Sequence, residues 1–154
     1  MMKAPRTWIV LADASRARII RHLPDHRESE EKHDEIQLHS EPRRRSEIMA
    51  DKPGRSFASE GTRRSAMEYR SDPVREEERA FARRIVRLLE ERCLEDDFDR
   101  LVLFAAPRML GDLRDAMTES VRKFIIAEID KDLTKLSGNA LREEIKREAP
   151  NLWI

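Results

Sequence analysis

The feature that most constrains the fold is the run Leu-Val-Leu-Phe-Ala-Ala at residues 101–106. It is preceded by Phe98-Asp-Arg100 and followed by Pro107, in a chain of which 40% is charged. An unbroken apolar run of this length is typical of a strand that is covered on both faces. Such a strand needs helices above and below it, and the amphipathic segments at residues 73–93 and 107–117 are suitable. The sequence therefore predicts an α/β fold packed around this strand.

Three shorter segments near the start also have strand patterns. Residues 8–12 are apolar, a turn-like Asp-Ala-Ser follows at residues 13–15, and residues 17–23 form a second run that ends before Pro24. Two strand-like runs this close together predict an antiparallel hairpin. Residues 33–39 alternate polar with apolar side chains, which predicts a third, half-buried strand at the edge of the sheet.

A long helix is predicted from residue 73, because Asp72 is a favourable N-cap and Pro73 suits the first helical position. After residues 107–117, a short helix is expected at residues 118–122. Residues 124–133 fit a helix or a strand, and we interpret them as the last strand. A final helix capped by Ser137 or Asn139 should end before Pro150.

This order of elements is typical of a ribonuclease H-like fold, so we expect one domain over residues 1–154 with a mixed five-stranded sheet and helices on both faces. In nucleases of that fold, carboxylates at strand ends hold two metal ions. Asp13 lies at the end of the first predicted strand, Asp130 and Asp132 lie at the end of the last, and the three could form such a site. An aspartate before Ala-Ser is also an ordinary turn residue, and we favour that interpretation and expect no metal.

Residues 41–71 lack any periodicity, and a loop of this length inside a compact domain is usually functional or disordered. Between residues 42 and 67 there are seven basic and three acidic residues, in a chain whose formal net charge is +0. The alternative is a solubilising disordered segment. Pro53-Gly54, followed by an arginine and Phe57, favours a functional loop. The basic residues, which we expect to contact RNA phosphates, are Arg43, Arg44, Arg45, Lys52, Arg55, Arg63 and Arg64.

Other chemistry is weakly indicated. The spacings of His22, His26, His33 and His39 match no zinc pattern, and Cys93 has no histidine partner that the sequence places beside it. Dinucleotide-binding, Walker and nucleophile-elbow motifs are missing, so we expect no cofactor. One cysteine, no signal-peptide pattern and no membrane-length apolar run predict a cytoplasmic protein without membrane contact.

Several motifs together resemble a known family over nearly the whole chain. They are Asp51-Lys-Pro-Gly-Arg-Ser-Phe57, Arg64-Ser-Ala-Met67, Phe81-Ala82, Phe98-Asp-Arg-Leu-Val-Leu-Phe-Ala-Ala-Pro-Arg-Met-Leu-Gly111 and Ala127-Glu-Ile-Asp-Lys-Asp-Leu-Thr134. The chain resembles the bacterial family named "protein required for attachment to host cells". That family is similar in turn to the central domain of archaeal and eukaryotic class I peptide-release factors and of Pelota.

The resemblance implies a ribonuclease H-like sheet with a functional loop between the third strand and the long helix, where residues 41–71 lie. Release factors carry Gly-Gly-Gln in that loop, and this chain has no such motif, so we do not expect the same peptidyl-tRNA hydrolysis. We expect a factor that binds ribosomal or other structured RNA, in rescue, termination or dormancy. The alternative is a signalling or scaffold protein that binds another protein through the edge strand or residues 152–154. A metal-dependent nuclease comes third.

Overall fold

The computed structural model describes residues 5–21, 35–40 and 72–153, with one mixed five-stranded sheet among them. The strand order is β3-β2-β1-β4-β5; β2 is antiparallel to β1 and β3, whereas β1, β4 and β5 are parallel. This confirms the predicted α/β class. The strands are β1 (Thr7–Ala12), β2 (Arg16–Ile20), β3 (Glu35–His39), β4 (Arg100–Ala105) and β5 (Ile125–Ile129). The predicted hairpin and edge strand correspond to β1–β2 and β3.

The middle strand is β1, and β4 lies beside it. Every residue of β1 is buried, as are all residues of β4 after Arg100. Because both strands are buried on both faces, both have apolar sequences. The longer apolar run, at β4, therefore does not identify the strand at the centre of the sheet. The place of β1 in the middle of the sheet depends on its two neighbours. A short turn pairs it with β2, and β4 pairs with it in parallel from Thr7↔Arg100 to Ala12↔Ala105.

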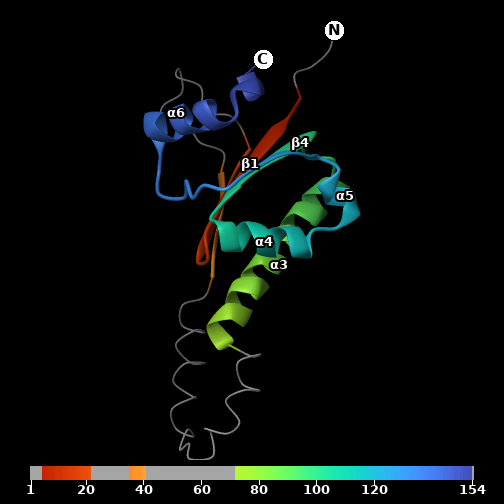
Figure 1. Cartoon of the computed structure of the whole chain (residues 1–154). Coiled ribbons are helices and arrows are strands. Elements are labelled where there is room, and N and C mark those ends of the chain that lie inside the picture. The colour runs from red at the N-terminus through yellow and green to blue at the C-terminus, as the bar shows by residue number, and fades with distance from the viewer. Residues whose placement is uncertain (1–4, 22–34, 41–71, 154) are drawn as a thin grey trace, which may run out of the picture.

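The helices form two separate layers (Figure 1). They are α3 (Pro73–Leu94), α4 (Pro107–Ala116), α5 (Glu119–Arg122), α6 (Gly138–Glu148) and the 3-10 helix η4 (Pro150–Trp153). Helices α3, α4 and α5 pack on one face of the sheet, and α6 and η4 pack on the other. The expectation that the two helices flanking β4 would cover its opposite faces is therefore wrong.

The strand order explains this arrangement. The crossovers β3–α3–β4 and β4–α4–α5–β5 both join parallel strands, and both advance in the same direction across the sheet. Crossovers of this kind are almost always right-handed. Two connections of the same hand that advance in the same direction place their helices on the same face. The second face is left for α6, which follows the last strand.

Alternate residues of the buried strands supply the two cores. From β1, Trp8 and Val10 join the α3 side, whereas Ile9 and Leu11 join the α6 side. Leu152 of η4 is 5% exposed and belongs to the α6-side core. The suggestion that residues 152–154 form an interaction surface is therefore wrong for Leu152, because its side chain already fills the core.

The ambiguous residues 124–133 form β5 over Ile125–Ile129, as interpreted from the sequence, and the chain leaves the sheet after that strand. Leu133 is buried in the connection to α6. Of the two candidate caps for α6, Ser137 occupies the N-cap position.

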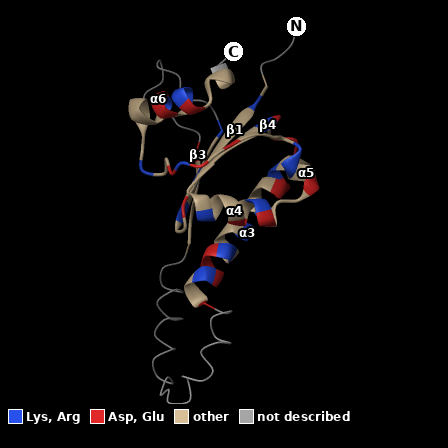
Figure 2. Ribbon diagram, viewed as in Figure 1, with Lys and Arg blue, Asp and Glu red and all other residues tan. Residues whose placement is uncertain are grey.

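Helix α3 has two chemically distinct sides. Phe81, Ile85 and Leu89 are buried against the sheet. Charged residues recur along the rest of the helix (Figure 2). This division follows the 3.6-residue period, because residues separated by three or four positions share one side.

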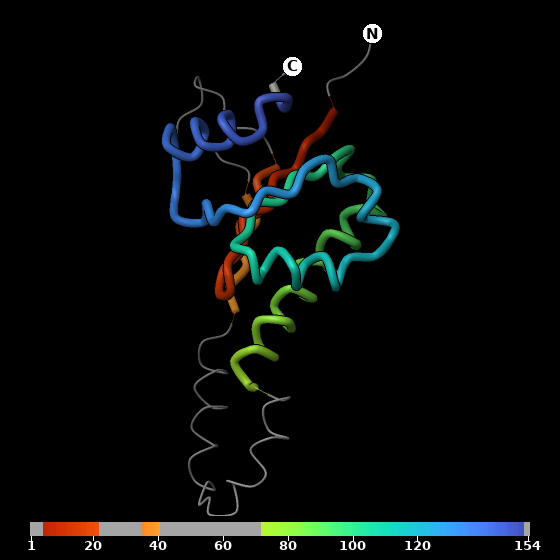
Figure 3. The backbone as a smooth tube through the Cα atoms, in the orientation of Figure 1, coloured from red at the N-terminus to blue at the C-terminus, as the bar shows by residue number. Residues whose placement is uncertain are grey.

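β3 ends and α3 begins at the same end of the sheet, where β1 also ends (Figure 3). The order of the described elements places residues 41–71 between these two points. The long segment thus leaves and rejoins the described fold at the carboxyl ends of the parallel strands.

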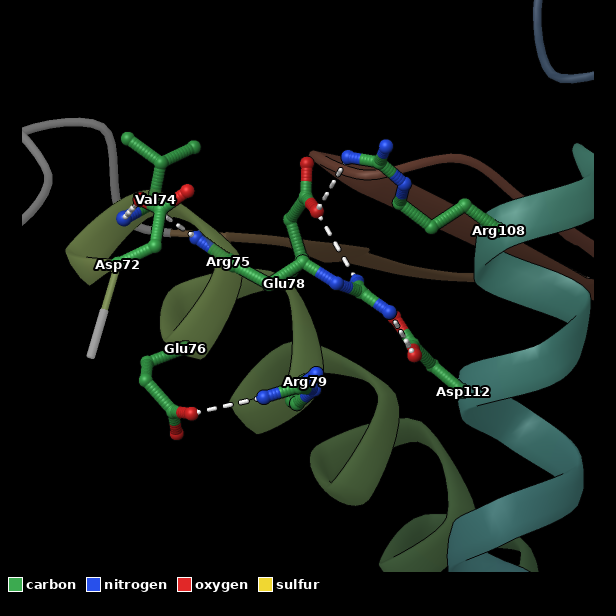
Figure 4. Close-up of polar contacts among 8 residues, drawn as sticks. All are labelled: Asp72, Val74, Arg75, Glu76, Glu78, Arg79, Arg108 and Asp112. Atoms are coloured by element: carbon green, nitrogen blue, oxygen red, sulfur yellow. Dashed lines mark hydrogen bonds and ion pairs between the residues drawn. The ribbon is translucent and has the colours of Figure 1, made fainter. Parts of the chain in front are cut away.

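The first turn of α3 has the predicted cap. The Asp72 side chain accepts hydrogen bonds from the Val74 and Arg75 backbone amides at 3.0 and 3.4 Å, and Pro73 follows it (Figure 4). These contacts satisfy amides that have no partner within the helix.

We predict that Asp72→Ala lowers the free energy of unfolding by about 1 kcal/mol, because the amides of the first turn lose their acceptor. Asp72→Asn keeps an acceptor oxygen and should lose only a few tenths of a kcal/mol from the lost charge at the helix N-terminus. Urea unfolding followed by circular dichroism measures both. Equal losses in the two variants would contradict the assigned cap.

Candidate functional site

The predicted RNA-contacting residues lie outside the described part of the chain. They are Arg43, Arg44, Arg45, Lys52, Arg55, Arg63 and Arg64, together with the loop residues Pro53, Gly54 and Phe57. The structure describes the two points from which this segment extends and the surfaces around them.

Ser40 and the first turns of α3 are in direct contact. The Ser40 backbone amide donates to the Ser15 carbonyl at 2.8 Å, and its hydroxyl lies 3.5 Å from Glu77 Oε1. Arg84 donates to the His39 carbonyl at 2.8 Å. The last residues before the segment are therefore held against the helix that follows it. In open α/β sheets this carboxyl edge is where ligands usually bind.

An ion-pair cluster fixes the start of α3 against α4 (Figure 4). Arg75 donates through both terminal nitrogens to the Asp112 carboxylate at 2.6 Å each, and to Glu78 at 3.1 Å. The Asp112 side chain is only 4% exposed. The hydrogen bonds that Arg75 donates to Asp112 and, to a smaller extent, to Glu78 raise its pKa above the usual range, and desolvation opposes this only in part. This bidentate contact with a buried carboxylate holds the start of α3, the helix that follows residues 41–71, in a defined position against α4.

The middle of α3 is basic on its exposed side, a surface for which the sequence predicted no function. Residues 79–89 contain four arginines and no acidic residue, a signal visible in the sequence. Arg79, Arg83 and Arg87 recur every four residues and are exposed, with a rise of about 6 Å from one to the next. We call these three residues the α3 arginine row.

Members of the row differ in their contacts. Arg79 pairs with Glu76 at 2.9 Å. Among the described residues, no hydrogen bond or ion pair engages the side chains of Arg83 and Arg87. Their charges are available to an anionic partner.

The carboxylates considered for a metal site are only partly brought together. The Thr134 hydroxyl lies 3.1 Å from Asp13 Oδ2 and 2.6 Å from Asp132 Oδ1. With one proton, it donates to one of them at a time. Asp130 is exposed and takes no part in these contacts. Within residues 5–21, 35–40 and 72–153, no three side chains of the metal-binding types form a group suited to a metal ion.

Asp13 instead stabilises the turn between β1 and β2. Its Oδ1 accepts hydrogen bonds from the Ser15 and Arg16 backbone amides, each at 2.8 Å, and from the Ser15 hydroxyl at 3.3 Å. Burial acts to raise the pKa of Asp13, but these bonds and the one from Thr134 outweigh it and lower the pKa below 3.8. This is the ordinary turn role favoured from the sequence.

The remaining candidates show no catalytic arrangement in the described residues. His39 is exposed on β3, while His22, His26 and His33 lie outside the described part of the chain. Cys93 is half-buried, with Sγ 3.7 Å from the Ser120 carbonyl. None of the described helices is both long and apolar enough to cross a bilayer.

Residues 8–145 match the model of the protein family described as "Protein required for attachment to host cells". The match extends from β1 to α6 and includes residues 41–71. The curated proteins compared with the chain include no match.

We predict a pH-dependent contribution of Asp13 to stability. Because its folded-state pKa lies below 3.8, the ionised carboxylate stabilises the fold above that pH, and this contribution is lost as the pH falls through the folded-state value. Asp13→Asn should therefore unfold more easily than the wild type by roughly 1 kcal/mol near neutral pH, with the difference shrinking in acid.

Urea unfolding at several pH values between about 2 and 6 measures this difference. Asp130→Asn is the matched control, since Asp130 is exposed and has no hydrogen bond to its side chain from another described residue. If the two variants show the same difference from wild type at every pH, the role assigned to Asp13 is wrong.

Proposed function

The chain belongs to the family of proteins required for attachment to host cells, and from the charge of residues 41–71 we propose that it acts through structured RNA, on the ribosome or elsewhere. Residues 41–71 make the main contact through Arg43, Arg44, Arg45, Lys52, Arg55, Arg63 and Arg64. The observation that carries the proposal is their excess positive charge, seven basic against three acidic residues between residues 42 and 67, in a chain of net charge +0. Arginine side chains bind phosphate oxygens bidentately.

The surroundings of the segment support this use. Ser40 and Asp72 flank it at the carboxyl edge of the sheet, and the Arg75–Asp112 contact fixes the helix that follows. The α3 arginine row begins one turn beyond that contact, after the acidic residues Glu76, Glu77 and Glu78, and it adds a second group of basic residues on the helix that follows the segment. A strand of RNA presents phosphates at a spacing comparable to the rise of about 6 Å between successive arginines of the row.

We also propose a relationship to the central domain of class I release factors and Pelota, with a ribonuclease H-like sheet. The two antiparallel pairings of the early strands followed by two crossovers support it. Since Gly-Gly-Gln is missing from the sequence, the proposed activity is binding in rescue, termination or dormancy, with no peptide release. A cytoplasmic RNA factor would affect host attachment indirectly.

A protein partner is the second candidate, and one observation favours it. β3 is an edge strand, and its outer side carries no described strand. Exposed edges can pair with a strand of another chain. A pull-down product that survives nuclease treatment would support this candidate.

The experiment is co-sedimentation with ribosomes over a range of salt concentrations. We expect binding that weakens steeply with salt, because phosphate contacts release counterions. Changing Arg43, Arg44, Arg55 and Arg64 together to alanine should reduce the slope of log affinity against log salt by about 3. Arg83→Ala with Arg87→Ala should weaken binding less, since two contacts are removed instead of four.

Lys123→Ala with Lys146→Ala is the matched control for the α3 variant. Both lysines are exposed and lie outside the α3 arginine row: Lys123 follows α5, and Lys146 is on α6. The control removes two positive charges, as the Arg83 and Arg87 double variant does. No binding by the wild type, or equal binding by the fourfold loop variant, would contradict the proposal.

A further inference from the structure

A cleft of about 610 Å³ lies on the α6 side of the sheet, over β2 and β3 and beside the connection between β5 and α6. Small-molecule sites usually have volumes of about 300–1,000 Å³. Arg16, Arg18, Glu35 and His39 line it from the two strands, and Thr134, Lys135 and Leu136 line it from the connection. It is separate from the α3 row, which lies on the helix covering the opposite face.

A buried ion pair forms the frame of the cleft. The Arg18 guanidinium donates to both carboxylate oxygens of Glu35, at 2.6 and 3.1 Å, and the two side chains are 13% and 8% exposed. The same guanidinium donates to the Thr134 and Leu136 carbonyls at 3.1 and 2.5 Å. One arginine thus joins β2, β3 and the connection, so the walls are held at a fixed separation.

The charge on the walls is positive. Glu35 is the sole acidic residue among the described lining residues, and Arg18 neutralises it. Arg16 on β2 and Lys135 in the connection are both exposed, and neither side chain has an ion-pair partner among the described residues. Thr134 lines the cleft and its hydroxyl lies beside the carboxylates of Asp13 and Asp132, but neither aspartate is a lining residue. A concave surface with uncompensated cations concentrates anions.

We propose that this cleft binds a phosphate-bearing small molecule of about the size of a nucleoside monophosphate. Arg16 from β2 and Lys135 from the connection bind the phosphate, which gives two charge-assisted contacts. Leu136, which is half-buried, supplies apolar surface for the rest of the ligand, and Gln37 supplies polar groups. The proposal does not rest on RNA binding by residues 41–71, because the residues that carry it belong to β2, β3 and the connection between β5 and α6.

Isothermal titration calorimetry of the full chain with the four ribonucleoside 5′-monophosphates, the corresponding nucleosides and inorganic phosphate tests the proposal. At least one nucleotide should bind, more tightly than inorganic phosphate, and its nucleoside should bind at least tenfold more weakly. Arg16→Ala and Lys135→Ala should each weaken binding on the order of tenfold, the loss expected from one charge-assisted hydrogen bond.

Lys146→Ala removes an exposed lysine of α6 that does not line the cleft, and it should bind the nucleotide like the wild type. Circular dichroism checks that each variant is folded, and Arg16→Gln and Lys135→Gln replace any alanine variant that is not. The fourfold loop variant should also bind normally, which separates this site from RNA binding. Absence of nucleotide binding by the wild type, or wild-type affinity in both the Arg16 and Lys135 variants, would overturn the proposal.

Discussion

The parallel pairing of β1 with β4 determines where everything else in this molecule can lie. Six consecutive residue pairs join the two strands, and almost all of their side chains are buried. Buried backbone amides and carbonyls must be paired, and this ladder pairs them while directing alternate side chains to opposite faces. Both strands therefore end at one edge, where Asp13 and Ala106 begin the next connections.

Because of this arrangement, the two faces of the sheet are covered by different elements and carry different candidate binding sites. Both crossovers place their helices on one face, so the start of α3 and the Arg75–Asp112 contact come to the carboxyl edge beside Ser40. The opposite face is covered by α6 over β1 and β4, while the polar residues of β2 and β3 border the cleft. The proposed RNA contact and the proposed phosphate cleft thus use different surfaces of one sheet.

Local signals in the sequence predicted local structure well. Asp72-Pro73 marked the start of α3 because capping depends on neighbouring residues alone, and the apolar runs marked buried strands. The face on which each helix packs could not be predicted, since it depends on strand order and crossover hand. Leu152 looked like a free apolar residue because its partners, Leu141 and Ile145 among them, come from another helix. The sequence also could not show which arginines would be neutralised: Arg75 and Arg18 are, whereas Arg83 is not.

The central claim is that positive charge on residues 41–71, extended by the α3 arginine row, is the surface that meets RNA. Ultraviolet cross-linking of the full chain to ribosomes, followed by mass spectrometry of the RNA-bound peptides, tests it most directly. The account predicts cross-links in residues 41–71 and in the exposed side of α3. Cross-links confined to α6 and the β2–β3 face, or none at all, would contradict it.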